Sequence, residues 1–233
     1  MQIKKKILDF FYPKFCLICG KESTYLCPDC FSKIEILKSP TCSYCNSRSF
    51  NGTICKKHKK RIKGIVSAVS YENKNIKKLI NVFKYQFVKE LSKNSAFLIL
   101  KFLKENPEIE FFKNPLGFLI VPIPLHKRRL RWRGFNQAEE IAKELSPLLK
   151  IPMDAKIIIR KKYTKPQAIL KGKNRTENIK GTFKIEKRKL KYIQKKKIIL
   201  LDDVTTTLST LEEAAKTLKE NGVKEVWGLT LAK

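Results

Sequence analysis

The chain has 233 residues, enough for one well-packed domain and a small additional module. Its hydrophobic content of 42% is that of a globular protein, and no apolar run reaches the ~18 residues that a membrane span needs. The net charge of +30 comes mainly from lysine, because only 9 of the 51 basic residues are arginines, and it attracts polyanions without specifying one. The start, MQIKKKILDFFYP, lacks the features of a signal peptide, so we predict a cytoplasmic protein.

The cysteines are confined to the N-terminal module, which we place at residues 1–62. Seven cysteines and one histidine form four pairs with two residues inside each pair, which is the ligand spacing of two tetrahedral zinc sites. An odd cysteine count without a secretion signal argues against disulfides, and a redox motif would need only one pair. The candidate ligands in chain order are Cys16, Cys19, Cys27 and Cys30 for one site and Cys42, Cys45, Cys55 and His58 for the other. Both sites would be structural because no position is left for water, while a cross-braced pairing stays open.

The remaining residues, 63–233, alternate between strand and helix patterns. Such alternation predicts a parallel sheet with helices on both faces and a ligand at the carboxyl ends of its strands. Residues 171–197 carry 12 basic residues and two glycines, so we expect a mobile arm or hairpin outside the core. The predicted strands span 65–71, 117–124, 157–159, 197–204 and 225–231, and the predicted helices lie within 75–106, at 136–149 and at 208–221.

Arginine placement is more informative than the total charge. Four of the nine arginines fall in the octet from His126 to Arg133, in a chain that otherwise uses lysine. Guanidinium groups grip phosphate or carboxylate through two parallel hydrogen bonds, so the octet predicts an anion site. The alternative is a solvated basic loop.

The segment KIILLDDVTTTLST, residues 197–210, ends an apolar strand in two adjacent carboxylates. Asp202 and Asp203 would lie at the carboxyl end of the sheet, and the threonines after them would form a turn into a helix N-terminus. Amides and hydroxyls at such a turn bind anions, and paired carboxylates suit a sugar diol or a divalent metal. The predicted ligand is therefore a phosphorylated sugar, and the alternative is an acidic N-cap on an ordinary helix.

The DDVTTTLST loop is similar to the loop of type I phosphoribosyltransferases, and nearly the whole chain resembles the ComF family of competence-associated proteins. The resemblance rests on LDFFYPKFCLICG, the cysteine pairs, VPIPLHKRRLRWRGFNQAEEIA (121–142) and KPQAILKGKNRTENIKGTF (165–183). It implies a zinc-binding module joined to a phosphoribosyltransferase fold that binds phosphoribosyl pyrophosphate with Mg²⁺. It also implies a role in handling incoming single-stranded DNA, with other DNA-uptake proteins, during natural transformation.

By this resemblance Asp202 and Asp203 would hold the ribose, the following loop would cradle its 5′-phosphate, and residues 165–184 would close over the substrate. The sequence departs from the family pattern where Leu208 replaces a loop glycine. If that position needs positive φ or close approach of the backbone to phosphate, leucine is a poor occupant. The implied substrate-binding residues are Thr205, Thr206, Thr207, Leu208, Ser209, Thr210, Lys127, Arg128, Arg129, Arg131 and Arg133.

Three functional hypotheses follow. In the first hypothesis, the protein is a DNA-uptake protein. Its aromatic residues Trp132, Phe135 and Tyr163 would then either stack on bases or belong to the core. Alternatively it is an active phosphoribosyltransferase, a glycosyltransferase of nucleobase salvage whose acceptor the sequence does not name. A third reading is a sensor that binds phosphoribosyl pyrophosphate without turnover. The sequence leaves the oligomeric state open.

Overall fold

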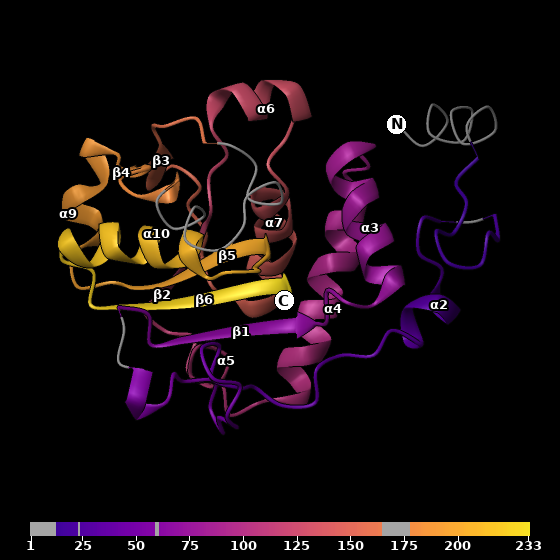
Figure 1. The fold of residues 1–233 in the computed structure, drawn as a ribbon, viewed down its shortest axis with the longest axis horizontal. Helices are drawn as coiled ribbons and strands as arrows, with labels where there is room; N and C mark the ends of the chain where they lie inside the picture. The colour runs from indigo at the N-terminus through magenta and orange to yellow at the C-terminus, as the bar shows by residue number, and fades with distance from the viewer. Residues whose placement is uncertain (1–12, 23, 59–60, 165–177) are drawn as a thin grey trace.

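The structure, a computed structural model, describes residues 13–22, 24–58, 61–164 and 178–233. At its centre lies a four-stranded parallel sheet with the strand order β1-β6-β5-β2 (Figure 1). This arrangement confirms the predicted parallel sheet, and the predicted bounds of the strand at 197–204 are those of β5. The four strands are β1 (Gly64–Val69), β2 (Phe118–Pro122), β5 (Lys197–Val204) and β6 (Glu225–Ala232).

The apolar run of β5 reflects burial on both faces of the sheet. Ile199 and Leu201 belong to the hydrophobic core on one face, whereas Ile198 and Leu200 belong to the core on the other. Successive side chains of a strand point to opposite faces, so an unbroken apolar run indicates a sheet covered on both sides. The first carboxylate, Asp202, comes only where β5 approaches its carboxyl end.

Helices supply that cover (Figure 1). Apolar residues of α3, α4, α5 and α7 fill one core, and those of α10 fill the other. The side chain of Asn73 caps α3 by accepting hydrogen bonds from the backbone N–H groups of Asn75 and Ile76. The bounds are α3 (Lys74–Tyr85), α4 (Leu91–Glu105), α5 (Glu110–Lys113), α7 (Gln137–Leu149) and α10 (Ser209–Glu220). None of the helices in the described ranges is both long enough and apolar enough to cross a bilayer.

Residues 178–193 correct one prediction. They are not an arm outside the core, because Ile179, Phe183, Ile185 and Ile193 are buried in the same core as α10. Sparse apolar residues among many lysines hid this packing, since each buried side chain has charged neighbours in the sequence. Residues 165–177, which include the start of the predicted arm and most of the predicted closing loop, lie outside the described residues. Residues 178–193 contain β4 (Phe183–Ile185), η3 (Lys187–Lys189) and α9 (Leu190–Ile193). Strand β4 pairs antiparallel with β3 (Ile158–Arg160).

The two cysteine clusters dock on different parts of the domain. The first lies around α2 (Pro28–Ser32), and its Cys16, Cys30 and Ile34 join the core that α3 and α4 line. The second ends at η1 (Lys56–His58) and lies against β1, where Thr53 forms an antiparallel bridge with Gly64. The N-terminal module therefore packs on the sheet domain at two places rather than standing apart from it.

Both edge strands of the sheet are covered by other parts of the chain. On β1, the N–H of Leu37 donates to the carbonyl of Ala68 at 2.9 Å, and the hydroxyl of Ser43 donates to the carbonyl of Ile65 at 2.9 Å. On β2, the backbone of Ile120 exchanges hydrogen bonds with residues 152 and 154 at 2.8 and 2.9 Å. The N-terminal module thus occupies hydrogen-bonding groups that an open sheet edge would expose.

Candidate functional site

The two carboxylates at the end of β5 are held by backbone hydrogen bonds and by one lysine. Asp202 accepts from the N–H of Asp203 at 2.9 Å, and Asp203 accepts from the N–H of Val204 at 2.7 Å. The ammonium group of Lys84, in the last turn of α3, lies 2.9 Å from Oδ2 of Asp203. Asp203 is buried, with 7% of its surface exposed, so this ion pair is largely shielded from water.

The neighbourhood shifts the protonation of Asp202. Burial, together with the nearby charge of Asp203, raises the pKa of Asp202 to about 7, although Lys84 and Arg160 act in the opposite direction. One lysine therefore does not neutralise two adjacent carboxylates completely. At neutral pH Asp202 is poised between its acid and its ionised form, so it can donate or accept a hydrogen bond.

A cavity of about 390 Å³ opens over this pair. Its walls bring together the carboxyl end of β5, the loop before α10, the last turn of α3 and α6 (Lys127–Arg133). Thr206 of this loop and Thr210 in the first turn of α10 line the cavity, and both are predicted phosphate contacts. The cationic side chains in the lining are Lys84, Arg129, Arg133 and Arg160. Carboxylates on one wall and guanidinium groups on another suit a ligand that carries both hydroxyls and phosphate.

Helical periodicity divides the arginine octet. Arg129 and Arg133 are four residues apart, so they share one face of α6, and both line the cavity. Arg129 donates to the carbonyl of Thr164 at 2.8 Å, and burial lowers its pKa. The other predicted contacts on this helix do not line the cavity and lie exposed on its remaining surface: Lys127, Arg128 and Arg131.

The RGFNQA motif, residues 133–138, holds the arginines in place. Gly134 ends α6 with a φ of +74°, and the ring of Phe135 then packs on Phe83 with centroids 5.7 Å apart. The buried amide of Asn136 donates to the carbonyl of Ile123 at 3.0 Å. Phe135 is therefore half-buried and packs against the core, which favours the core alternative over base stacking for this residue.

Gln137 completes this arrangement by linking α6 to α3. Its amide nitrogen donates to the carbonyl of Phe83 at 3.3 Å, and its oxygen accepts from Arg133 at 3.1 Å. Gln137 and Phe83 are both buried. The side chain of Gln137 therefore holds both the backbone of Phe83, next to Lys84, and the side chain of Arg133. The motif thus sets the positions of two of the cavity's cations.

The threonine loop, residues 205–210, leads into α10, and its Leu208 has a φ of +58°. Of the two conditions considered for this position, positive φ is the one that the structure shows. The isobutyl group packs against the core on the α10 side, and Leu208 is not among the residues that line the cavity. Of the other predicted loop residues, Thr205 and Ser209 are buried and Thr207 is half-buried, so Thr206 and Thr210 are the ones at the cavity wall.

Two cations of the site were absent from the sequence-based prediction. Arg160 follows the apolar run 157–159, and its guanidinium donates to Thr164 Oγ1 at 2.6 Å. Burial lowers the pKa of Arg160 to about 10, so it remains charged at neutral pH. Its position at a strand end, in a chain poor in arginine, was a usable signal. Lys84 offered none, because it is one lysine among many in α3.

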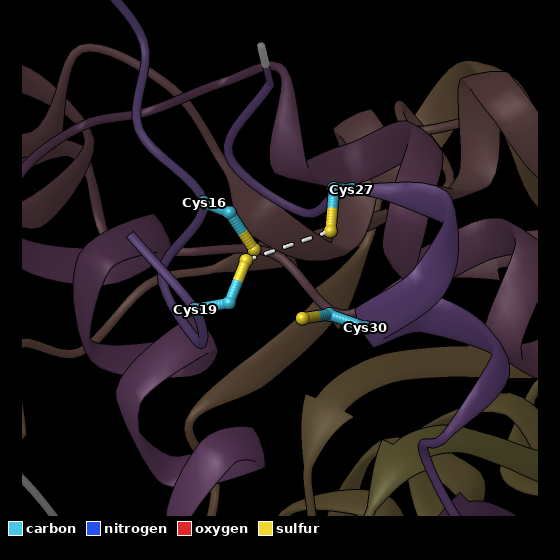
Figure 2. A group of neighbouring side chains, drawn as sticks. All are labelled: Cys16, Cys19, Cys27 and Cys30. Carbon is cyan, nitrogen blue, oxygen red and sulfur yellow. Dashed lines mark hydrogen bonds between the residues drawn. The ribbon is translucent and has the colours of Figure 1, made fainter. Parts of the chain in front are cut away.

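The first cysteine cluster has the geometry of a zinc site (Figure 2). The sulfur atoms of Cys16, Cys19, Cys27 and Cys30 point toward one another and lie within 4.8 Å of one another. The sulfurs of Cys19 and Cys27 are 3.8 Å apart. Zinc–sulfur bonds of about 2.3 Å in a tetrahedron place two sulfurs ~3.8 Å apart, so the residues present fit the ion.

The second cluster repeats this geometry with Cys42, Cys45, Cys55 and His58. The sulfurs of Cys45 and Cys55 are 3.7 Å apart, and Nδ1 of His58 lies 3.1 Å from the sulfur of Cys55. The structure therefore groups the ligands in chain order and not in the cross-braced pairing.

The two clusters begin with the same backbone turn. The N–H of Cys16 donates to the carbonyl of Lys21, and that of Cys42 donates to Ser47. In each turn the residue after the second cysteine is left-handed, Gly20 with a φ of +75° and Asn46 with a φ of +57°. Glycine and asparagine tolerate that conformation best, which explains their presence at these equivalent positions.

Side chains of the second turn bind the sheet domain directly. The hydroxyl of Tyr44 donates to the carboxylate of Glu212 on α10, while its ring stacks on His58. Lys233, which follows β6, donates to the hydroxyl of Thr41 at 2.8 Å. The second cluster is therefore fixed to the helix that begins at the threonine loop.

Comparisons with known proteins agree with this division of the chain. Residues 7–58 match the double zinc ribbon domain family, and residues 133–233 match the phosphoribosyl transferase domain family. The fold is therefore a phosphoribosyltransferase-type domain with an N-terminal double zinc ribbon, as the sequence predicts.

Three curated proteins show how far this similarity extends. Competence protein F of Haemophilus influenzae is 32% identical over 89% of this chain and 90% of its own length. Competence protein ComFC of Streptococcus pneumoniae is 26% identical over 100% of this chain and 97% of its own. The DNA utilization protein YhgH of Escherichia coli is 36% identical over 47% of this chain and 48% of its own. The similarity to Competence protein F covers both the zinc ribbons and the sheet domain, so this chain belongs to the ComF family of competence proteins.

Proposed function

We propose that the cavity over Asp202 and Asp203 binds phosphoribosyl pyrophosphate. One observation carries the proposal: two carboxylates, two loop threonines and three arginines line a single cavity of about 390 Å³. The ligand has the matching chemistry, because its ribose offers hydroxyls to carboxylates while its phosphates need cations and helix N-terminal amides. A volume of this size is also in the range of small-molecule sites.

Each part of the ligand has a counterpart in the site. Asp202 and Asp203 would accept hydrogen bonds from the ribose hydroxyls, and the loop with Thr206 and Thr210 would receive the 5′-phosphate. Arg129 and Arg133 would contact the pyrophosphate. Carboxylate oxygens suit Mg²⁺, which would neutralise part of the pyrophosphate charge when it binds with the ligand.

Calorimetric titration tests this proposal on the zinc-loaded protein. Phosphoribosyl pyrophosphate with Mg²⁺ should bind, and the double variant Asp202→Asn/Asp203→Asn should lose binding. Arg129→Gln should weaken binding at least tenfold, because it removes a charge from the cavity wall. The matched control Arg131→Gln removes the same charge from the exposed face of α6 and should change affinity by less than twofold. Equal losses in the two arginine variants would contradict the assignment.

The described residues support binding and leave turnover to experiment. Transfer of the ribosyl group requires no enzyme nucleophile, because cations that stabilise the departing pyrophosphate are sufficient. An active phosphoribosyltransferase would release pyrophosphate when a panel of nucleobases is added, whereas a sensor would bind the ligand and release none. That assay separates the two alternatives.

A second proposed activity is contact with single-stranded DNA beside the cavity mouth. Trp132 is 60% exposed on α6, and its ring meets those of Tyr85 and Phe87 with centroids 6.3 and 5.7 Å away. Arg133 lies over the Tyr85 ring, 5.5 Å from its centroid. Exposed aromatic rings interleaved with guanidinium groups suit unpaired bases and a phosphate backbone, since bases stack on such rings in single-strand binding proteins.

Fluorescence anisotropy with a labelled single-stranded oligonucleotide tests this surface. Binding should weaken as salt rises, and Trp132→Ala should reduce affinity about tenfold because one stacked base is lost. Phe97→Ala is the matched control, since Phe97 on α4 is also exposed and also lies beneath a cationic side chain, Lys93 in place of the Arg133 that lies over Trp132. Identical effects of the two substitutions would exclude a specific role for the Trp132 surface.

The names of the relatives agree with these proposals. Competence and DNA utilization are properties of those proteins, and we propose the corresponding role here: handling of single-stranded DNA in the cytoplasm during natural transformation, together with DNA-uptake proteins. We also propose that Cys16, Cys19, Cys27, Cys30, Cys42, Cys45, Cys55 and His58 hold two structural zinc ions. Their role would be to keep the ribbons docked on the sheet domain.

A further inference from the structure

The cation nearest to the carboxylate pair belongs to the protein itself. Nζ of Lys84 is 2.9 Å from Oδ2 of Asp203, with side chains only 19% and 10% exposed. An ammonium group at this distance occupies the side of the carboxylate that a divalent cation would need. Lys84 also lines the cavity, so the pair is part of the site and not of the surface around it.

The backbone that carries Lys84 is fixed by its neighbour. The Phe83 side chain is fully buried, its carbonyl accepts from Gln137 at 3.3 Å, and its ring packs on Phe135. The lysine lies in the last turn of α3, where the helix dipole favours a positive charge. Only the four-carbon side chain is therefore able to swing away from Asp203.

The other charges that face the pair come from two elements, β3 and α6. Arg160 on β3 acts electrostatically on Asp202, and Arg129 and Arg133 on α6 line the same cavity. Without a ligand, two carboxylates thus face one ammonium group in contact and three guanidinium groups farther away. A free divalent cation that entered here would meet repulsion from all four.

We infer that Lys84 is a resident counter-ion that keeps free divalent cations off Asp203 and yields that carboxylate only when phosphates of the ligand enter the cavity. The inference rests on the proposed binding of a phosphorylated sugar. The incoming phosphates give the displaced ammonium group and the three arginines new partners, and they bring their own bound cation. Metal and ligand would then bind together and not in sequence.

Binding of Mn²⁺, followed by electron paramagnetic resonance on the zinc-loaded protein without any sugar phosphate, tests the inference. The unmodified protein should bind Mn²⁺ weakly at this site. Lys84→Met and Lys84→Gln should each bind it at least tenfold more tightly, whereas Lys84→Arg should stay weak because the charge remains. Adding Asp203→Asn to Lys84→Met should abolish the gain, which places the ion at this carboxylate.

The matched control is Lys78→Met, which removes the same charge from an exposed position of α3. It should leave Mn²⁺ affinity unchanged. The inference is overturned if Lys84→Met and Lys84→Gln gain no affinity, or if Lys78→Met gains as much. Because this assay contains no phosphoribosyl pyrophosphate, its failure differs from failure of the proposed function, which would appear as absence of sugar-phosphate binding to the unmodified protein.

Discussion

Tyr44 of the second zinc ribbon donates its hydroxyl hydrogen bond to Glu212, in the first turn of α10. The N–H of Glu212 in turn donates to the carbonyl of Leu208 at 2.9 Å, which closes the turn after the threonine loop. The two residues are 168 positions apart in the sequence. A zinc ribbon therefore touches the same helical turn that the proposed phosphate site uses.

Replacing Tyr44 by Phe should destabilise the protein by about 1 kcal/mol, because one net hydrogen bond is lost and a carboxylate is left without it. Urea denaturation of the zinc-loaded protein measures this change. A double-mutant cycle with Glu212→Gln isolates the pair, and a coupling energy near zero would show that the two side chains act independently.

The free energy of unfolding should depend on the charge of Asp202. Because the pKa of Asp202 is raised from 3.8 to about 7, its contribution is fully present below pH ~4 and is lost as the pH rises to about 7. Asp202→Asn keeps an acceptor for the N–H of Asp203 but cannot ionise. Its stability relative to the unmodified protein should therefore rise between pH 5 and pH 8, by at most about 3 kcal/mol, because only the part of the pKa window between pH 5 and pH ~7 is crossed. Urea denaturation at the two pH values that shows the opposite slope would contradict this account.

Leu208→Gly should leave affinity for phosphoribosyl pyrophosphate within twofold and lower stability by about 1 kcal/mol. Relief of the left-handed strain and the greater entropy of an unfolded glycine nearly cancel, so the lost packing of the isobutyl group remains. Calorimetry and thermal unfolding measure the two effects. A large gain in affinity would mean instead that the leucine narrows the phosphate cradle.

Zinc content should distinguish the pairing of the ligands. The unmodified protein should hold two zinc ions per chain, and Cys16→Ser/Cys30→Ser should retain one because both substitutions fall in the same cluster. Cys16→Ser/Cys55→Ser should retain none. Elemental analysis of the purified proteins gives the answer, and loss of both ions from the first variant would support a cross-braced arrangement.

The sequence predicted the parts of this fold that depend on local pattern. The apolar run of β5 and the end of α10 are of this kind, and Gly222, directly after the predicted helix 208–221, is left-handed with a φ of +85°. The sequence also predicted two anion- and sugar-binding groups, the Asp pair and the arginine octet, on different elements. The structure brings Asp203, Arg129 and Arg133 to one cavity.

Features that depend on contacts between residues far apart in the chain could not be predicted from the sequence. Lys84 matters only because α3 packs where its last turn faces β5, and no local pattern distinguishes it from the other lysines of that helix. The sequence left Phe135 open between base stacking and the core, and only the packing of its ring on Phe83 favours the core. Ile179 and Ile193 are buried for the same reason, since each contacts a core that residues far along the chain provide.

The cover that the zinc ribbons provide over β1 has a consequence for the metal-free protein. The hydrogen bonds from Leu37 and Ser43 to this strand come from the segment between and within the two clusters. If zinc is removed and the segment detaches, β1 becomes an exposed edge whose unpaired carbonyls are a template for strands of other molecules. We therefore expect the zinc-free protein to aggregate through intermolecular strand pairing rather than to persist as a folded domain without its ribbons.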